Sequence, residues 1–207
     1  MTTLNCKAIL AGAILALAGC ADGIDVGRAA PQSVVVASDS VVIAGPPGFC
    51  VDRGASRIDG DQAFVLLGSC AAISRNPGQP SPGVPGLLTV TVSEGRTGEA
   101  VAGAVLAEMA AFIETPEGRA ALSRSGRAET VDILETKVRG DVLYIHARDR
   151  SAGQIGVAPD YWRALFGLKN RLLTVSVVGF EDAPISDDTG LSVLDAFAAR
   201  IRVENGA

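Results

Sequence analysis

The stretch ETVDILETKVRGDVLYIHAR, residues 129–148, decides which fold the sequence predicts. Residues 129–138 and 142–148 contain many of the branched and aromatic side chains that favour strands. Between them, the tripeptide Arg139-Gly140-Asp141 is typical of a tight hairpin turn. The stretch therefore predicts two antiparallel strands joined by a short turn.

Further strands are predicted on both sides of this hairpin. A second hairpin should join residues 161–166 to residues 171–180 across the turn residues 167–170. The proline-rich segment 76–86 is expected to be an irregular connection. Upstream, apolar or alternating runs predict strands at residues 38–44, 49–53, 63–73 and 87–93.

Helices are expected in the middle and at the end of the chain. Apolar residues recur at helical spacing between Val101 and Ile113, and Thr115 followed by Pro116 is typical of the start of another helix. After Ser186, one apolar stripe predicts a C-terminal helix. The stripe consists of Leu191, Leu194, Phe197, Ala198 and Ile201. This order of elements predicts an α+β fold, in which helices pack on an antiparallel sheet.

The order of elements over residues 34–203 resembles that of the PsbP and Mog1-like α+β domains. The shared features are the stretch Pro47-Gly48-Phe49 beside an early hairpin, a middle helix, a late meander and a closing helix. Members of that group mostly bind or assemble with other proteins, and they offer no catalytic set to carry over. The resemblance therefore implies a binding function.

The N-terminal residues have the layout of an export signal. Lys7 precedes an apolar run at residues 8–18, which is too short for a helix to cross a bilayer. The run continues into Leu17-Ala18-Gly19-Cys20, which resembles the lipobox of bacterial lipoproteins. The resemblance implies a signal peptide over residues 1–19 and a lipid on Cys20. An ordinary secretory signal followed by a coincidental cysteine is the alternative.

The lipobox resemblance also implies a location. Acyl chains on Cys20 would hold the protein firmly on a membrane. Residue 21 is Ala, and not the Asp that retains enterobacterial lipoproteins at the inner membrane. We therefore expect the outer membrane, with the domain facing the periplasm, in preference to the inner membrane. Residues 20–33 would form a tether, and residues 34–207 would form one α+β domain.

The four cysteines have separate fates in this scheme. Cys6 leaves with the signal peptide and Cys20 takes the lipid, so Cys50 and Cys70 remain in an oxidising compartment. Each lies ten residues from Gly60, in the expected turn, so the two would face each other across a hairpin. This arrangement predicts a Cys50–Cys70 disulfide. A redox-active or metal-binding thiol pair is the alternative, although no Cys-x-x-Cys motif favours it.

The residues favour no catalytic or cofactor chemistry. A net charge of −5 offers no basic field for nucleic acid. Residues 45–48 begin like a phosphate-binding loop but lack the Gly-Lys that should follow, so no ATP site is predicted. The only histidine, His146, is expected to pack on a strand. The acidic group near the C-terminal helix should serve turn and cap roles, so no metal or cofactor is predicted; it comprises Asp182, Asp187 and Asp188.

These observations favour a non-catalytic lipoprotein of the cell envelope that binds or helps to assemble another envelope protein. A carrier that holds an apolar small molecule or lipid between sheet and helices is the alternative, suggested by an interior rich in Ala, Val and Leu. An uncharacterised enzyme is a third hypothesis. A large continuous pocket would favour the carrier, whereas an exposed apolar patch over a dry core would favour a protein partner.

Replacement of the lipid acceptor tests the anchor. Cys20→Ala should leave the chain unprocessed or free of the membrane, because alanine has no thiol to accept the lipid. Detergent partitioning and mass spectrometry of the mature N-terminus measure both effects. An unmodified Cys20 in the wild type, or cleavage at another position, would contradict the prediction.

Overall fold

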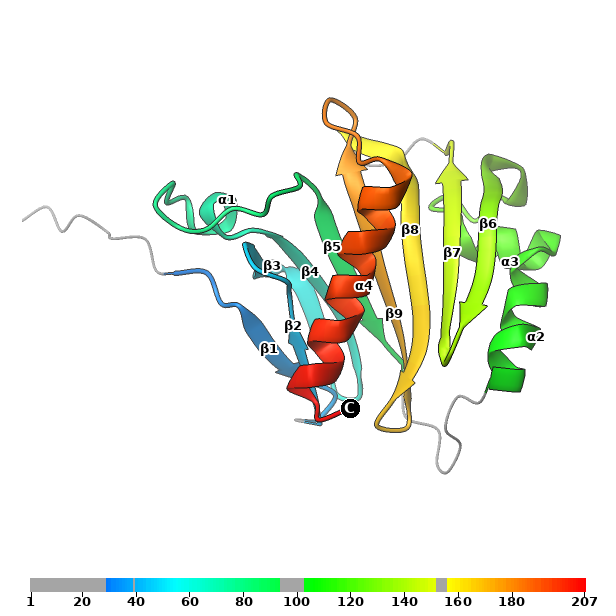
Figure 1. The fold of residues 1–207 in the computed structure, drawn as a ribbon, viewed down its shortest axis with the longest axis horizontal. Helices are drawn as coiled ribbons and strands as arrows, with labels where there is room; N and C mark the ends of the chain where they lie inside the picture. Colours follow the sequence, from blue (N-terminus) through cyan, green and yellow to red (C-terminus); the bar gives the residue numbers. More distant parts are fainter. Residues whose placement is uncertain (1–28, 39, 94–102, 152–155) are drawn as a thin grey trace, which may run out of the picture.

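Seven antiparallel strands form one sheet in the computed structural model, in the order β3-β4-β5-β9-β8-β7-β6 (Figure 1). The structure describes residues 29–38, 40–93, 103–151 and 156–207. The predicted signal peptide, Cys20 and most of the tether lie outside the described residues. The sheet strands are β3 (Phe49–Asp59), β4 (Gln62–Ser69), β5 (Leu87–Val92), β6 (Val131–Arg139), β7 (Val142–Asp149), β8 (Val157–Leu168) and β9 (Arg171–Phe180).

The remaining elements are a separate hairpin and the helices. The hairpin consists of β1 (Ser33–Val36) and β2 (Val41–Ala44). The helices are α1 (Cys70–Ser74), α2 (Gly103–Ile113), α3 (Pro116–Leu122), the 3-10 helix η1 (Ala128–Thr130) and α4 (Asp187–Glu204). The predicted α+β fold, with an antiparallel sheet and a C-terminal helix packed on it, is confirmed. No helix among the described residues is long and apolar enough to cross a membrane.

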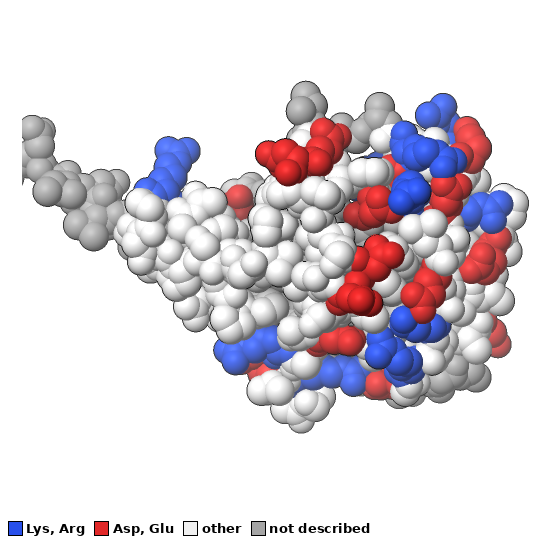
Figure 2. Space-filling model, turned by 45° about the horizontal axis from the view of Figure 1, so that its top comes forward, with Lys and Arg blue, Asp and Glu red and all other residues white. Residues whose placement is uncertain are grey.

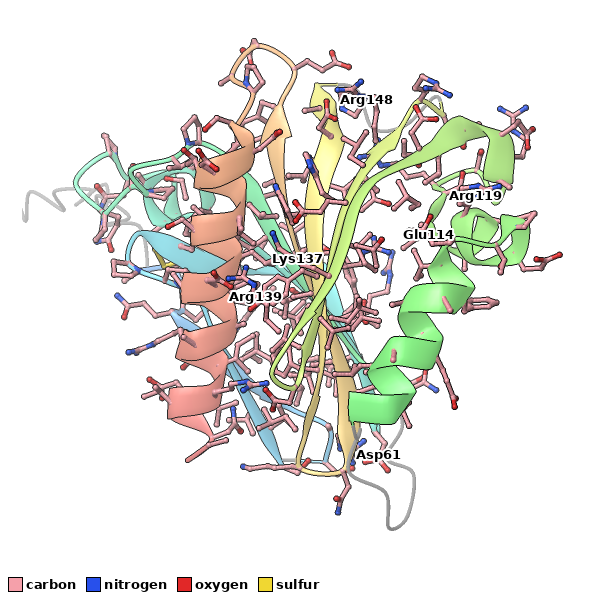
Figure 3. The ribbon with its side chains drawn as sticks, turned by 45° about the vertical axis from the view of Figure 1, so that its right-hand side comes forward. Asp61, Glu114, Arg119, Lys137, Arg139 and Arg148 are labelled. Atoms are coloured by element: carbon pink, nitrogen blue, oxygen red, sulfur yellow. A yellow bond between two sulfur atoms is a disulfide. The ribbon has the colours of Figure 1, made fainter. Side chains whose placement is uncertain are left out.

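The two faces of the sheet carry different elements. α4 lies along one face together with the β1–β2 hairpin, whereas α2 contacts β6 and β7. Figure 3, viewed from the side of β6, shows α4 and α2 on opposite faces. Alternate side chains of the strands therefore enter two cores. The larger core, under α4, contains Phe166, Phe197 and Ile201, and the smaller core, under α2 and α3, is built around Leu106 and Leu143.

The hairpin predicted at residues 129–148 is confirmed, with its first strand starting two residues later. Arg139 pairs with Val142, and Gly140 has the positive φ, +60°, that a two-residue turn requires. His146 is buried and stacks on Trp162, with ring centroids 4.4 Å apart. The predicted packing role of His146 is therefore confirmed.

Two predicted strands are wrong in part. Residues 38–44 do not form one strand, because Ala37 and Ser38 have left-handed backbones that separate β1 from β2. Residues 63–73 divide as well, since β4 ends at Ser69 and α1 follows. At the second break the apolar run continues past the end of the strand, through Ala71, Ala72 and Ile73. Hydrophobicity alone therefore does not reveal the change of direction.

The predicted disulfide between Cys50 and Cys70 is present, with the two Cα atoms 4.8 Å apart. The predicted register is wrong, however. Cys50 lies opposite Gly68, and Cys70 is the first residue of α1. A bulge in β3 causes the shift. Asp52 pairs with Leu66 and Arg57 pairs with Phe64, so β3 advances by more residues than β4 between the two pairs. The disulfide therefore ties α1 to β3.

Removal of this disulfide should lower stability without changing the fold. Cys50→Ser and Cys70→Ser should each cost about 2–5 kcal/mol in free energy of unfolding, and the double variant should be no worse than either single variant. Urea unfolding of the three variants measures these values. Two free thiols per chain in the unfolded, unreduced wild type would contradict the premise.

Trp162 fixes the distance between α4 and the sheet. Its indole lies between the His146 ring and the backbone of Gly190 in α4. A Cβ atom at Gly190 would lie 2.7 Å from Trp162 Cδ1, closer than real contacts allow. Trp162 Nε1 is buried without a hydrogen-bond partner among the described residues. The absence of a side chain at Gly190 therefore lets α4 approach the sheet.

Gly190→Ala should destabilise the domain, although Gly→Ala inside a helix usually stabilises. The usual gain is about 0.5–1 kcal/mol, whereas overpacking against a rigid ring costs about 1–3 kcal/mol. Thermal unfolding measures the net effect. Ala199→Gly, on the exposed side of α4, is the control that gives the size of the helix-propensity contribution. An increased melting temperature for Gly190→Ala would contradict the proposed close contact.

Candidate functional site

Half of one sheet face is left uncovered by the described helices and strands. On the face opposite α4, α2 and α3 lie at the β6 edge and α1 lies near β3 and β4. The strands β4, β5 and β9 lie between these helices. Their side chains point alternately to the two faces, so one set enters the core under α4 and the other set points away from it. We call the second set, with Arg163 of β8, the open face. Its central residues are Phe64, Leu66, Leu87, Thr89, Thr91, Arg163, Thr174, Ser176 and Val178, of which Ser176 is buried.

A cavity of about 500 Å³ opens at one end of the open face. Its floor contains Leu66 and Leu87, and α1 contributes Ile73. Gly68 also lies in the wall, where a Cβ atom would have ordinary contacts of 3.6 Å with both Ile73 and Leu87. The lining is completed mainly by residues of the proline-rich loop, including Pro82 and Pro85, and by Phe180. This end of the open face is therefore concave and largely apolar.

The helix α2 lies on the same side of the sheet, over β6 and β7. Successive helical residues are about 100° apart, and Leu106 and Ile113 of α2 are buried against the sheet. On one flank, Glu114, just after α2, accepts a hydrogen bond from Thr136 of β6 at 2.9 Å (Figure 3). The other flank therefore faces the open half of the sheet. It carries the apolar residues Val105, Met109 and Phe112, of which Val105 and Phe112 are 41% and 49% exposed.

Arg163 is the one charged residue among those that form the open face. It lies on β8 between Tyr161 and Leu165, which belong to the core under α2. Its Nε donates a hydrogen bond to Ser176 Oγ at 3.1 Å, and its guanidinium lies 5.1 Å from the centre of the Tyr161 ring. Burial lowers the pKa of Arg163, but a guanidinium remains protonated in proteins. A positive charge is therefore fixed on β8, next to the strands β7 and β6 that α2 contacts.

The buried carboxylate of Asp149 already has hydrogen-bond partners within the domain. It accepts hydrogen bonds from the backbone of Arg124 at 2.7 Å and from the backbone and hydroxyl of Ser151 at 2.9 and 2.7 Å. Burial by itself would raise the pKa of Asp149, but these hydrogen bonds hold it below its ordinary value. Asp149 makes no ion pair with Arg163. Its role is to tie the segment after α3 to the end of β7.

Charged side chains gather elsewhere on the molecule. Figure 2 shows Lys, Arg, Asp and Glu of both signs over β6, β7 and β8, whereas the half with α1 and the β1–β2 hairpin carries few of them. Many are paired across strands, such as Arg148 with Asp160 at 2.8 Å. Lys137 and Arg139 of β6 point to the α4 side (Figure 3), where Arg139 lies over the Tyr144 ring. On the surface shown in Figure 2, the charges therefore form a mixed, largely paired surface.

The residues singled out in the sequence do not form the open face. Cys20 lies outside the described residues. Cys50 and Cys70 support α1, which forms one wall of the cavity. His146 lies on the opposite side of the sheet, 3.6 Å from Asp187. Among the described residues, no group of three or more His, Cys, Asp or Glu side chains could hold a metal ion.

The sequence does contain two signals for the open face. The strand Leu87–Val92 alternates Leu88 and Val90 with Thr89 and Thr91, as expected when one face is buried and the other is not. In β8, Arg163 interrupts an apolar run, and a charge in such a run needs a structural or functional reason.

The comparisons with known proteins add no function to this geometry. No protein-family model matches the chain, and no curated protein matches it.

Proposed function

We propose that the chain is a lipid-anchored carrier of the cell envelope that holds an apolar molecule on the open face. The observation that carries the proposal is the cavity of about 500 Å³ between Leu66, Leu87 and α1. Small-molecule sites are concave, mainly apolar and of about 300–1,000 Å³, with few polar groups. The cavity has this composition, because its lining is mainly apolar and its polar side chains are Asp52, Ser69 and Ser81.

The anchor supports the same function. The Leu17-Ala18-Gly19-Cys20 motif would place a lipid on Cys20, and β1 begins at Ser33. The tether between them would span at most about 45 Å. This length keeps the open face close to a bilayer, from which apolar molecules can be taken. The outer membrane, with the domain in the periplasm, is the location that we propose.

A protein-binding or assembly module is the second candidate. The observation that favours it is the exposed apolar flank of α2, with Val105 and Phe112, because exposed apolar patches often mark protein interfaces. The resemblance to PsbP and Mog1-like domains also favours a protein-binding module. This resemblance rests on the order of the helices and strands alone. The cavity favours the carrier, since a flat protein interface does not require it.

Filling the cavity tests the carrier function. Gly68→Leu should place a side chain between Ile73 and Leu87 and abolish binding, because a Cβ at Gly68 fits there without strain. Membranes from cells that contain the full-length chain are exposed to dodecanol bearing a photoreactive diazirine. Mass spectrometry of the labelled peptides should locate the label on β4, β5 or α1 in the wild type, and Gly68→Leu should lose it.

Gly83→Leu is the matched control for this experiment. Gly83 lies in the proline-rich loop beside the cavity, and a Cβ atom there would have nothing within 4 Å. This variant should be labelled like the wild type. The absence of label from β4, β5 and α1 in the wild type, or equal labelling of Gly68→Leu when that variant is folded, would contradict the carrier function. A protein-binding module would give the first of these results.

A further inference from the structure

The position of Arg163 on the open face identifies the ligand more closely, an inference that depends on the proposed carrier function. We infer that the bound molecule is a single-chain amphiphile with a carboxylate headgroup, that Arg163 holds the carboxylate, and that the chain extends across the strands into the cavity. The inference combines the geometry of Arg163, its alignment with the cavity and the distribution of charge along the open face.

The guanidinium of Arg163 has donors left to bind a ligand. Its Nε is used by Ser176, and the Tyr161 ring lies beside it, so the side chain is held in place. Arg163 forms no ion pair, and no hydrogen bond from Nη1 or Nη2 is found in the described part of the chain. Two parallel N–H groups on a planar guanidinium match the two oxygens of a carboxylate. Because the site is partly buried, such a bond is less screened than one on the surface.

Arg163 and the cavity lie in one row across the sheet. Arg163 pairs with Ser176, Ser176 pairs with Thr89, and Thr89 pairs with Leu66, which lines the cavity. Neighbouring strands are about 4.8 Å apart, so Arg163 and Leu66 are separated by roughly 14 Å. Between them lie only the small side chains of Thr89, which is half-buried, and Ser176, which is buried. An extended acyl chain can therefore lie over this row with its end in the cavity.

Charge gives the ligand one orientation. At the far end of the same row, Asp52 pairs with Leu66 and also lines the cavity. Its Oδ1 accepts hydrogen bonds from the backbone N–H groups of Gly54 and Ala55 at 2.9 and 3.0 Å. A second carboxylate would be repelled by Asp52 and attracted by Arg163. The headgroup therefore lies at β8, and the end of the chain lies between β4 and α1.

Competition among amphiphiles that differ only in headgroup tests the inference. In the membranes described above, dodecanoate, dodecanol and dodecyl phosphate compete with the photoreactive dodecanol for the full-length chain. Dodecanoate should displace the label from the wild type at a concentration roughly tenfold or more below that of dodecanol, the value expected for a charge-assisted hydrogen-bond pair. Arg163→Gln should remove this preference while the neutral probe still binds.

Arg200→Gln is the matched control, because it removes the same charge from α4 on the opposite face. This variant should keep the preference for dodecanoate. If Arg163→Gln does not fold, Arg163→Lys retains the charge without the paired donors and should retain only part of the preference. The comparison of headgroups in the wild type requires no substitution.

The outcomes separate the two proposals. Equal competition by dodecanoate and dodecanol in the wild type would overturn the role of Arg163 but leave the carrier function in place. Stronger competition by dodecyl phosphate than by dodecanoate would overturn the carboxylate. The absence of labelling by the neutral probe at β4, β5 and α1 would instead contradict the carrier function itself.

Discussion

The packing of α4 against the sheet is the contact on which the rest of the domain depends. Leu194, Phe197 and Ile201 of α4 are fully buried, and the β1–β2 hairpin packs beside the helix on the same face. Asn205, at the end of α4, joins the two by hydrogen bonds to both backbone groups of Val42. One face of the sheet is thereby covered from β3 to β7. The domain has a complete core on this side, and stability does not require that the other face be covered to the same extent.

The incomplete cover on the second face creates the geometry on which the proposed carrier function rests. Here the described residues form only the short helices α2 and α3 at one edge and α1 at the other. The strands β4, β5 and β9 lie between them with threonine, serine and leucine side chains. Such a surface is less apolar than a core and less polar than an ordinary exterior. It is an intermediate surface, suited to a ligand with one apolar and one charged end.

Local patterns were sufficient to predict most of the fold but not the site. The hairpin at residues 131–149 and the stripe of α4 follow from periodicity and turn chemistry, so both were predicted. The Cys50–Cys70 pair was predicted, but the predicted register was wrong, because the bulge after Asp52 leaves no clear hydrophobic signal. The open face depends on which helix covers which strand. That is a tertiary property, and the alignment of Arg163 with the cavity follows only from the pairing of β8, β9, β5 and β4.

The disulfide between β3 and α1 links the proposed ligand cavity to the proposed export of the chain. α1 forms one wall of the cavity, and the Cys50–Cys70 bond is its covalent connection to the sheet. In a reducing cytoplasm that bond does not form, so a newly made chain lacks the restraint on this wall. On the proposed route, oxidation after export would add this restraint. The proposed carrier would thus reach full binding capacity only on the far side of the inner membrane, and it would not deplete the cytoplasm of acyl compounds during its own export.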